Sequence, residues 1–257
     1  MTQMNADFSI KLAETADEIA AAQRLRYRVF VEEMGAQTNA SNQAIGLEAD
    51  GYDAYFDHLI LQDNNLPQND NVVGVYRLLR SEAAKTGLGF YSASEFKLDK
   101  IINCGRNAVE LGRSCIDARY RGGTAMYFLL NGLAEYVEKN KIEILFGAAS
   151  FHGTDIQTVA HGLSYLHHNH LAKNGLQVAA YGPNAIAMDI YDDTKTDRVA
   201  ALMQIPPLIK SYLRLGGTVG KGAYVDHAFN TIDICLVMDT AHMVQKYKNF
   251  YLRDTAA

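Results

Sequence analysis

The chain has 257 residues and a mass of 28.4 kDa, which allows one large domain or two small ones around a buried core. Hydrophobic residues make up 48% and charged residues 21%, which excludes a disordered chain, a collagen-like repeat and a pure coiled coil. The 24 Lys and Arg against 29 Asp and Glu give a net charge of −5, the wrong sign for a dedicated nucleic-acid-binding protein.

The first predicted element is a helix over residues 14–34. Apolar residues recur there at helical spacing, and Thr15 with Glu18 three residues later is the pattern of a capping box. Residues 35–56 are polar and irregular, so we expect a loop.

Two strands are predicted next, at residues 58–62 and 72–79. The turn-rich segment 63–67 lies between them and predicts a hairpin. A loop with a short helix is expected up to residue 102.

The middle of the chain predicts a strand, a glycine loop, a helix and another strand. The strands are expected at 108–116 and 142–150, with a Gly122-Gly123 pair and a helix over 124–139 between them. Since a crossover of this kind places its two strands in parallel, we expect them to be neighbours in one sheet.

The last predicted elements are a helix at 157–168, a strand at 185–190, a helical region at 199–214 and a strand at 231–237. No repeat or low-complexity linker divides the chain. The order of elements therefore predicts a single α/β domain.

Charge is unevenly placed along the chain. Residues 29–76 contain no Lys or Arg but eight acidic residues, which suits a cationic ligand. Residues 77–121 contain nine basic and five acidic residues, which suits an anionic one. Solvated faces would account for the same imbalance.

One set of charged residues would need partners if it were buried. The set comprises Arg26 with Phe30, then Glu48, Asp50, Asp53 and Asp57, then Arg77, and finally Glu110 with Arg113. In a regular strand Glu110 and Arg113 would point to opposite faces, so we expect a β-bulge at Gly112. An ion-pair network between helix and sheet is the alternative interpretation of the set.

The Gly122-Gly123 pair lies between a strand and the start of a helix. Glycines there let backbone N–H groups approach a phosphate, and the helix N-terminus adds partial positive charge. An ordinary turn would use the same glycines, and the segment matches neither a Walker loop nor a dinucleotide-binding motif.

This order of strand, Arg-Gly-rich loop, helix and strand resembles the acyl-cofactor half of the GNAT acyltransferase superfamily. Gly123 and Ala125 match the last two positions of the GNAT loop pattern, whereas Tyr120 departs from its first position. That departure weakens the case for acetyl-CoA as the donor.

Nearly the whole chain resembles the bacterial ornithine N-acyltransferases. The matching segments are 24–30, 57–59, 73–79, 89–96, 110–115, 150–155, 163–171, 206–216 and 229–233. The charged set described above also resembles the signature of acyl-homoserine-lactone synthases. The resemblance implies a GNAT-like α/β fold with a central mixed, twisted sheet flanked by helices. It further implies a single domain over 1–257 with a C-terminal extension, about 198–257, packed on it.

The resemblance also implies an activity, namely transfer of a 3-hydroxyacyl group from acyl carrier protein to the α-amino group of L-ornithine, giving lyso-ornithine lipid. The acyl-phosphopantetheine of the carrier protein would be the donor substrate, with no bound cofactor and no metal. Three alternatives stay open: another amino acid as acceptor (lysine, glutamine or glycine), acyl-homoserine-lactone synthesis, and a non-catalytic protein that binds acyl carrier protein or lipid.

An amine attacks a thioester only when it is unprotonated, so the reaction needs a base. Glu110 is the first candidate and Asp57 the second. Backbone N–H groups at a bulge over 112–114 are candidates for stabilising the oxyanion. Candidate acceptor-binding residues are Arg26, Arg77 or Arg113 for the carboxylate of ornithine and Asp50 or Asp53 for its side-chain ammonium, with Phe30, Ser150 and Phe151 nearby.

The phosphopantetheine arm is expected to follow the strand at 110–115 towards the glycine loop. The candidate donor-binding residues are Ser114, Cys115, Arg121, Gly122, Gly123 and Thr124. The carrier protein would dock on basic residues close to that loop.

The three cysteines do not suggest a disulfide scaffold, and neither a signal peptide nor an apolar run long enough to span a membrane is apparent. We therefore expect a cytoplasmic protein. Residues 198–225 are basic and apolar without an acidic residue, which suits peripheral contact with an anionic membrane. Packing of the same apolar residues in the core is the alternative.

Overall fold

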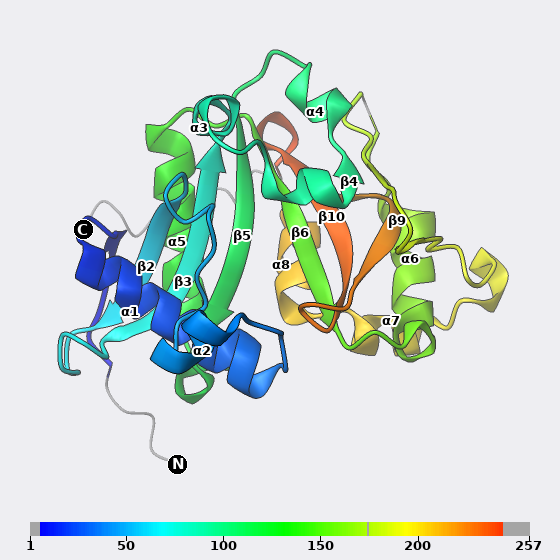
Figure 1. Cartoon of the computed structure of the whole chain (residues 1–257). Helices are drawn as coiled ribbons and strands as arrows, with labels where there is room; N and C mark the ends of the chain where they lie inside the picture. The colour runs from blue at the N-terminus through cyan, green and yellow to red at the C-terminus, as the bar shows by residue number, and fades with distance from the viewer. Residues whose placement is uncertain (1–5, 174, 244–257) are drawn as a thin grey trace.

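A mixed, twisted sheet with helices on both faces forms the centre of the computed structural model, which describes residues 6–173 and 175–243 (Figure 1). The strand order is β1-β2-β3-β5-β6-β10-β9-β7-β4, and β8 pairs with β9 beside this path. The strands are β1 Phe8–Leu12, β2 Asp57–Asp63, β3 Val72–Arg80, β4 Phe96–Lys97, β5 Ala108–Ile116, β6 Ile144–His152, β7 Ala179–Ala180, β8 Ala185–Ile186, β9 Thr218–Asp226 and β10 Thr231–Asp239. This architecture confirms the predicted fold class.

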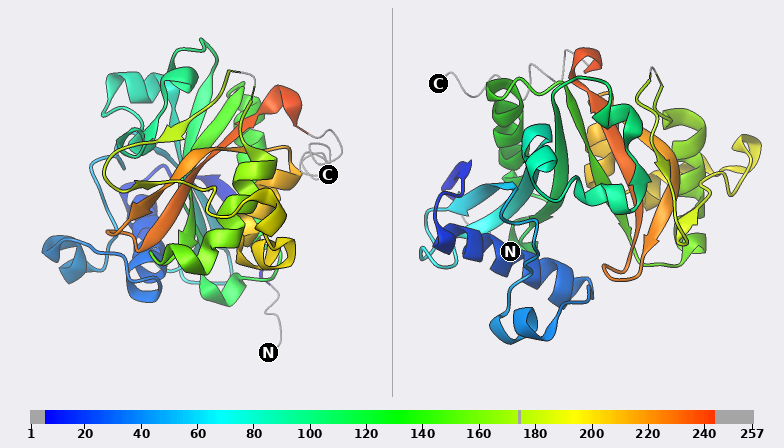
Figure 2. Two further views of the ribbon diagram at one scale, coloured as in Figure 1. Left: turned by 90° about the vertical axis from the view of Figure 1, so that its right-hand side faces the viewer. Right: turned by 45° about the horizontal axis from the view of Figure 1, so that its top comes forward.

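The helices lie on both faces of the sheet, as the turned views in Figure 2 show. They are α1 Ala16–Arg26, α2 Ala40–Ile45, α3 Ser81–Thr86, α4 Asp99–Ile102, α5 Ala125–Lys139, α6 Ala160–His170, α7 Arg198–Gln204 and α8 Pro207–Arg214. Helix α1 packs on β3 through Leu25 and Val75, whereas α5 packs on the opposite face through Leu129 and Leu78. β3 is therefore buried on both sides.

The predicted first helix begins as expected but changes character midway. Thr15 accepts a hydrogen bond from the Glu18 backbone N–H at 3.2 Å, and the Glu18 carboxylate accepts from the Thr15 backbone N–H, so the capping box is confirmed. The α-helix ends at Arg26 and continues as a π-helix over Tyr27–Glu33. π-Helical turns are rare and frequently occur at functional sites.

Most predicted strands of the middle of the chain are confirmed. β2 and β3 form the antiparallel hairpin, and β5 covers the predicted range from Ala108 to Ile116. β6 runs parallel to β5 after the α5 crossover, as expected. The prediction missed β1, β9 and α2, while the strand expected at 185–190 shortens to Ala185–Ile186.

The two strands of the crossover pair over only three positions. Ala108, Val109 and Glu110 of β5 face Ile144, Leu145 and Phe146 of β6, and beyond them the strands diverge (Figure 1). The strands are closest at Gly147, where an added Cβ would lie 2.1 Å from the Leu111 carbonyl oxygen. Glycine at this position therefore allows the backbones of β5 and β6 to lie in contact just before the strands separate.

The C-terminal part of the chain contributes β9 and β10 to the sheet, beside β6. The predicted helical region at 199–214 is divided into α7 and α8 where Pro206 and Pro207 interrupt helix hydrogen bonding. Of the C-terminal extension expected over 198–257, residues 244–257 lie outside the described residues.

Candidate functional site

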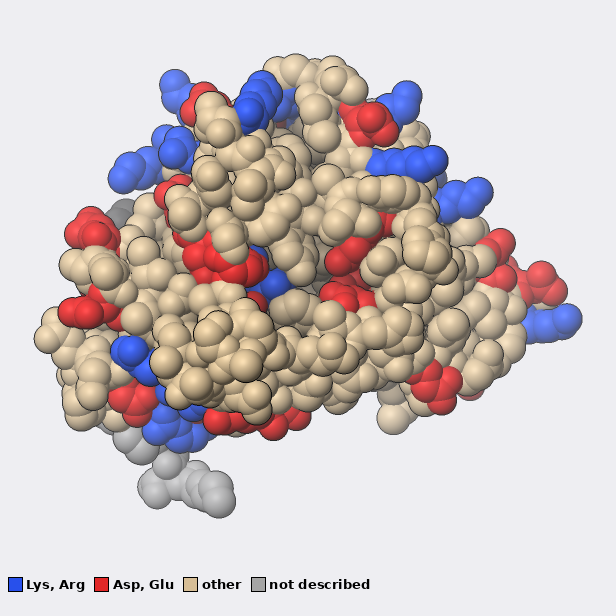
Figure 3. All heavy atoms as spheres, in the orientation of Figure 1, with Lys and Arg blue, Asp and Glu red and all other residues tan. Residues whose placement is uncertain are grey.

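The candidate site lies where β5 and β6 separate. A cavity opens there, lined by Tyr76, Leu111, Gly112, Arg113, Ser114, Gly147, Ala148, Ala149, Leu208, Tyr212 and Leu236. The face of the molecule drawn in Figure 3 is hollowed near its centre, with acidic side chains on both sides of a basic one. Charged side chains therefore lie around the gap between the strands.

A β-bulge in β5 shapes this site. Val75 of β3 pairs with Cys115, whereas Arg77 pairs with Gly112, so β5 carries one extra residue between these positions. Arg113 has a φ of 51°, in the left-handed region that a side chain rarely adopts. The bulge expected at Gly112 is confirmed one residue further on, and it turns Arg113 to the same face as Glu110.

Arg26 is fully buried at the end of α1 and its guanidinium is surrounded by acceptors. It donates to Glu48 Oε2 at 2.5 Å, to the Glu48 carbonyl oxygen at 2.7 Å and to Asp53 Oδ1 at 2.7 Å. All these partners come from the loop between α2 and β2. Arg26 therefore fixes that loop against the sheet.

Arg77 on β3 continues the network. Its Nη1 donates to Asp50 Oδ1 at 2.7 Å and to Asp53 Oδ1 at 2.8 Å, and its guanidinium lies 4.5 Å from the Phe56 ring centroid. Burial would raise the pKa of Asp53, but the guanidinium groups of Arg26 and Arg77 outweigh it and hold that pKa well below its usual range. Asp53 is thus ionised and compensated.

Arg113 is the most accessible of the three arginines, with a side chain 11% exposed against 0% for Arg26 and 1% for Arg77. Its hydrogen bonds are longer, at 3.2 Å to Glu48 Oε1 and 3.3 Å to the Tyr91 hydroxyl. Its guanidinium is stacked between the rings of Tyr91 and Phe229, 4.7 and 4.1 Å from their centroids. Arg113 is therefore the arginine best able to accept a further anionic partner.

The aromatic side chains that flank Arg113 were not among the predicted site residues. Tyr91 comes from the 3-10 turn Tyr91–Ser94, and Phe229 from the β9–β10 turn, where Phe30 also meets it at 6.2 Å between centroids. Both lie in segments that resemble the ornithine N-acyltransferases, 89–96 and 229–233. That resemblance was the one sequence signal for them.

Glu110 lies at the last position where β5 and β6 still pair. Its carboxylate accepts from the backbone N–H groups of Tyr91 and Ser92 at 2.7 Å each, and from the Ser92 hydroxyl at 2.5 Å. Burial raises the pKa of Glu110, and these donors offset only part of that effect. Glu110 therefore holds the 3-10 turn over the site and has an increased affinity for a proton.

Asp57 lies on the opposite face of the sheet from Glu110. Its Oδ2 accepts from the Tyr136 hydroxyl of α5 at 2.5 Å and lies 3.5 Å from Arg80 Nε. The structure therefore does not bring the two candidate bases together, because residue 57 belongs to the set of β2 side chains that face α5.

Two candidate donor-binding residues of β5 have different surroundings. Ser114 lines the cavity between the separating strands. Cys115 instead packs beneath α1 beside Leu25 and Val75, and burial raises the pKa of its thiol to about 12. Cys115 is therefore a protonated core residue at neutral pH.

The glycine loop precedes α5, as predicted. Gly122 has a φ of 77°, both glycines are exposed, and Thr124 at the helix start makes no side-chain capping hydrogen bond. Arg121 is already occupied, because it forms an ion pair with Glu33 and donates to the Ile116 carbonyl oxygen at 2.9 Å. The exposed backbone of this loop, more than Arg121, suits an anionic group.

Ser150 and Phe151 follow one another on β6 and therefore face opposite sides. Phe151 is 1% exposed in the main core. Ser150 pairs across the sheet with Asp233 of β10 and hydrogen-bonds its side chain. Of the two, Ser150 alone is on the face that carries Glu110 and Arg113.

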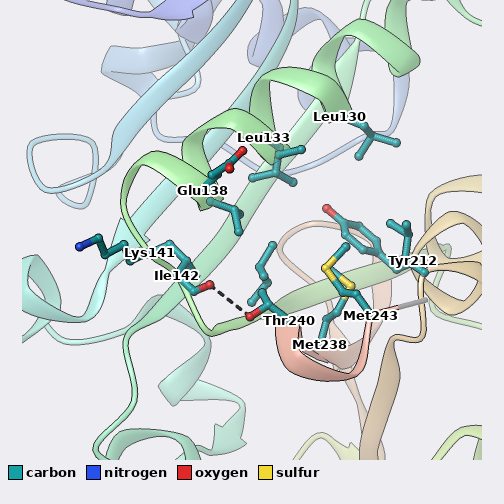
Figure 4. A pocket seen from close by; sticks show the side chains of 13 residues that line it. Leu130, Leu133, Glu138, Lys141, Ile142, Tyr212, Met238, Thr240 and Met243 are labelled. Atoms are coloured by element: carbon teal, nitrogen blue, oxygen red, sulfur yellow. Dashed lines mark hydrogen bonds between the residues drawn. The ribbon is translucent and has the colours of Figure 1, made fainter. Parts of the chain in front are cut away.

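An apolar pocket lies on the opposite face, beside α5 (Figure 4). Its lining is Leu130, Leu133, Ala134, Val137, Glu138, Lys141, Ile142, Leu145, Tyr212, Leu215, Met238, Thr240 and Met243. Tyr212 also lines the cavity between β5 and β6, and its hydroxyl lies 2.6 Å from the Tyr76 hydroxyl. This tyrosine pair therefore stands between the two spaces.

Within residues 6–173 and 175–243, one trio of potential metal ligands comes together, formed by Glu95, Asp226 and Asp233. Among the helices of that same part of the chain, none has the length and apolar character needed to cross a membrane.

Sequence comparison connects this site with acyl transfer. Residues 25–131 match the family model for an acetyltransferase (GNAT) domain. The chain is 49% identical to an L-ornithine N(alpha)-acyltransferase of Rhodobacter capsulatus, an alignment that covers 96% of this chain and 95% of the relative. It is 39% identical to an L-ornithine N(alpha)-acyltransferase of Brucella abortus, covering 94% of this chain and 88% of that relative.

Solved structures with the same fold are more distant in sequence. A CoA-dependent acyl-homoserine lactone synthase superposes with a TM-score of 0.53 at 14% identity, covering 96% of this chain and 89% of that one. An N-acyl amino acid synthase from uncultured soil microbes superposes with a TM-score of 0.51 at 13% identity, covering 92% and 93%. These similarities concern the fold.

Proposed function

Because the chain belongs to the L-ornithine N(alpha)-acyltransferase family, we propose that it transfers an acyl group to the α-amino group of L-ornithine. One observation carries this proposal: four L-ornithine N(alpha)-acyltransferases are 39–49% identical over at least 94% of this chain and at least 84% of their own lengths. The chain is an acyltransferase with a GNAT domain. The acceptor, the donor and the residue roles below are parts of the proposal.

The donor in this proposal is a 3-hydroxyacyl group on the phosphopantetheine of acyl carrier protein, and the product is lyso-ornithine lipid. The separated strands β5 and β6 offer a slot for the extended arm, and the exposed glycine loop at the start of α5 suits the phosphate at its end. The bulge at Arg113 interrupts the pairing of β5 with β3 beside the slot. Backbone N–H groups there would stabilise the oxyanion of the tetrahedral intermediate.

The acyl chain would extend towards the apolar pocket beside α5. That pocket is bounded by Leu130, Leu133 and Met238, and Tyr212 lines both it and the slot, so movement of this side chain would join the two spaces. Burying a long hydrocarbon chain there is favourable by about 0.8 kcal/mol for each methylene group. The lining supports a long acyl group better than an acetyl group.

Arg113 would receive the α-carboxylate of ornithine. The planar guanidinium can bind a carboxylate in a bidentate arrangement, and its position between the rings of Tyr91 and Phe229 holds it in place. Arg26 and Arg77 instead hold the surrounding loop through Glu48, Asp50 and Asp53. They would position the site without touching the substrate.

Glu110 would take the proton from the attacking ammonium, directly or through one water. Burial raises the pKa of Glu110, which makes its carboxylate a stronger base than an exposed glutamate. The bound amine then attacks the thioester carbonyl carbon to form the C–N bond. The C–S bond breaks, and the second proton lost by the nitrogen passes to the departing thiolate, which leaves as the carrier-protein thiol. Asp57 has no part in this step because it lies behind the sheet.

The test is mass spectrometry of the purified protein with 3-hydroxyacyl-acyl carrier protein and a pool of the twenty amino acids plus ornithine. Wild type is expected to form the acyl-ornithine mass. Glu110→Gln is expected to lower kcat/KM by roughly 10²- to 10⁴-fold, the usual size of a general-base contribution. A parallel reaction with the same acyl group on CoA identifies the carrier.

Glutamine keeps an acceptor for the Ser92 donors but turns its NH₂ group towards the Tyr91 backbone N–H, so the melting temperature of Glu110→Gln is expected to fall, and kcat/KM is therefore compared at a temperature where circular dichroism shows both proteins folded. Asp57→Asn is the matched control and is expected to keep most of the activity. A different acyl-amino acid as the main product would contradict ornithine as acceptor. No product with either carrier would favour a non-catalytic carrier- or lipid-binding protein.

A further inference from the structure

A second acidic cluster faces the site from the other side of the gap. Glu95 follows the 3-10 turn that Glu110 holds, Asp226 ends β9, and Asp233 lies on β10. Their carboxylates place oxygen atoms within 4.8 Å of one another. We refer to Glu95, Asp226 and Asp233 as the carboxylate triad.

The triad contains buried oxygen atoms without a hydrogen-bond partner. Glu95 is 5% exposed and Asp233 is 4% exposed, and neither Glu95 Oε2 nor Asp233 Oδ1 has a partner within the described part of the chain. Asp226 is half-buried and uses Oδ1 to accept from the backbone N–H groups of Ala228 and Phe229. The Asp233 side chain is otherwise hydrogen-bonded by the neutral hydroxyl of Ser150, and a buried carboxylate without a positive partner costs free energy unless a cation or a proton compensates it.

The charges around the triad leave it uncompensated. Burial and the neighbouring carboxylates raise the pKa of both Glu95 and Asp233, while Arg113 opposes the increase from a distance. No ion pair with a Lys or Arg is formed by these three residues in the described structure. The triad therefore lacks a positively charged partner among the described residues, and a cation or a proton has to compensate it.

The other acidic cluster cannot take that role. Asp50 and Asp53 were the candidates for the side-chain ammonium of ornithine, but both already accept from Arg77, and Asp53 also accepts from Arg26. Three arginines balance the three carboxylates of Glu48, Asp50 and Asp53. A cation there would have to displace an existing ion pair.

We propose that the carboxylate triad binds the side-chain ammonium of the acceptor and so selects a diamino acid. This inference rests on the proposed function, because it takes ornithine as the acceptor. Tyr91 links Arg113 and Glu110, since its ring lies against the Arg113 guanidinium and its backbone N–H donates to the Glu110 carboxylate. The carboxylate of ornithine would lie at Arg113, its α-amine near Glu110 and its far ammonium at the triad.

The test compares ornithine with norvaline, which has the same carbon skeleton without the side-chain ammonium. Steady-state kinetics with 3-hydroxyacyl-acyl carrier protein would be measured for wild type, Asp233→Asn, Glu95→Gln and the control Asp192→Asn. Asp192 is an exposed residue whose Oδ2 lies 3.5 Å from Lys195 Nζ, so a cation already compensates its charge, in contrast to the triad. The triad variants are isosteric and relieve repulsion, so they are expected to fold.

For Asp233→Asn, KM for ornithine is expected to rise roughly 10- to 100-fold with kcat retained, as expected for loss of a charge-assisted hydrogen bond. Norvaline kinetics are expected to stay unchanged, so the preference for ornithine falls. The control is expected to match wild type. An unchanged ornithine to norvaline ratio in both triad variants would overturn the proposal.

Two other outcomes would replace the proposal. An equal collapse of kcat for both amino acids would make the triad the general base. A melting temperature raised by MgCl₂, CaCl₂, MnCl₂ or ZnCl₂ in wild type but not in Asp233→Asn, with no effect of ornithine, would make it a metal site.

A binding measurement separates this proposal from the proposed function. Ornithine, but not norvaline, is expected to raise the melting temperature of wild type and to leave that of Asp233→Asn unchanged. This result without any acylated product would overturn only the proposed activity. Acyl-ornithine formation without a change in either triad variant would overturn only the triad.

Discussion

Buried carboxylates in this site differ in what compensates them. Asp53 lies between two guanidinium groups, so its pKa is lowered despite its burial, whereas burial and, after it, the neighbouring carboxylates raise the pKa of Glu95. Asp53 is therefore fully compensated by its ion pairs. An ionised Glu95 would instead destabilise the folded protein unless a cation or a proton compensated it.

The raised pKa of Glu95 predicts an effect on stability as well as on binding. A carboxyl group with a higher pKa in the folded state than in the unfolded state binds its proton more tightly when folded. Its contribution to stability is therefore complete at low pH and is lost as pH rises above the unfolded value of about 4.3 towards the folded value. The free energy of unfolding of wild type is therefore expected to fall between about pH 5 and pH 9, because Glu95 has a folded-state pKa of about 9.

Glu95→Gln removes this titration. Without added amino acid, we expect its melting temperature to match wild type near pH 5 and to exceed it by roughly 2–4 °C or more at pH 9. Differential scanning fluorimetry over this pH range is the measurement, with Asp192→Asn as the exposed control. A higher melting temperature for wild type than for Glu95→Gln at pH 9 would contradict charge repulsion within the triad.

Individual contacts were harder to predict from the sequence than the residues that make them. The charges of Arg26, Arg77, Arg113 and Glu110 gather in one site, and the bulge that reorients Arg113 was expected from spacing alone. Their partners depend on loop conformations that periodicity does not describe. The Tyr91 contacts, for example, depend on a 3-10 turn far from β5 in sequence.

At the scale of elements, the separation of β5 from β6 creates the site. The strands pair up to Glu110 and Phe146, and Gly147 then lies against the Leu111 backbone. A side chain at this point would meet a main-chain oxygen that cannot rotate away. The glycine therefore determines where the two strands part.

Gly147→Ala tests this role. Because the new Cβ would lie 2.1 Å from the Leu111 oxygen, we expect the variant to lose about 3 kcal/mol, the upper part of the usual overpacking range. Urea unfolding followed by circular dichroism measures the change. The control Gly112→Ala meets only Phe56 Cε1 at 3.8 Å and is expected to change stability by about 0.5 kcal/mol or less. Equal stabilities for the two variants would contradict the close approach.

Elements with a strong pattern were predicted and irregular ones were not. The hairpin strands contain the apolar runs 59–61 and 72–76, and the strand predicted at 142–150 contains the run 144–149. β9 was missed because its sequence contains two glycines and a lysine, and its pairing with β10 supplies what local preference lacks. The helix α2 was missed because it is six residues long and buries no residue.

For the molecule as a whole, the C-terminal segment 198–225 has a mixed role. Its Ile205, Ile209 and Tyr212 are buried, whereas Val199 and Met203 of α7 are 70% and 80% exposed. The core therefore contains part of the apolar set, and the rest lies on the surface in a segment that also carries Lys210 and Arg214. We propose peripheral contact of this surface with anionic membranes, since amphipathic basic segments bind there.

Liposome flotation with anionic vesicles tests this contact. Replacing Lys210 and Arg214 together by glutamate is expected to reduce the floating fraction strongly, because each basic residue near an anionic surface contributes about 1 kcal/mol. The control replaces Lys97 of β4 and Lys100 of α4 by glutamate, which changes the net charge by the same amount. Equal flotation of the two double variants would exclude a role for this segment.

The proposed acceptor site around Arg113 and the apolar pocket beside α5 lie on opposite faces of one sheet, with the gap between β5 and β6 between them. Under the proposed function, selection of the amino acid and selection of the acyl chain would therefore be physically separate. Under the proposed function, a change among Leu130, Leu133 and Met238 would alter the preferred length of the hydrocarbon while the head group stays the same. Lipid diversity could then evolve along two independent axes within this one architecture.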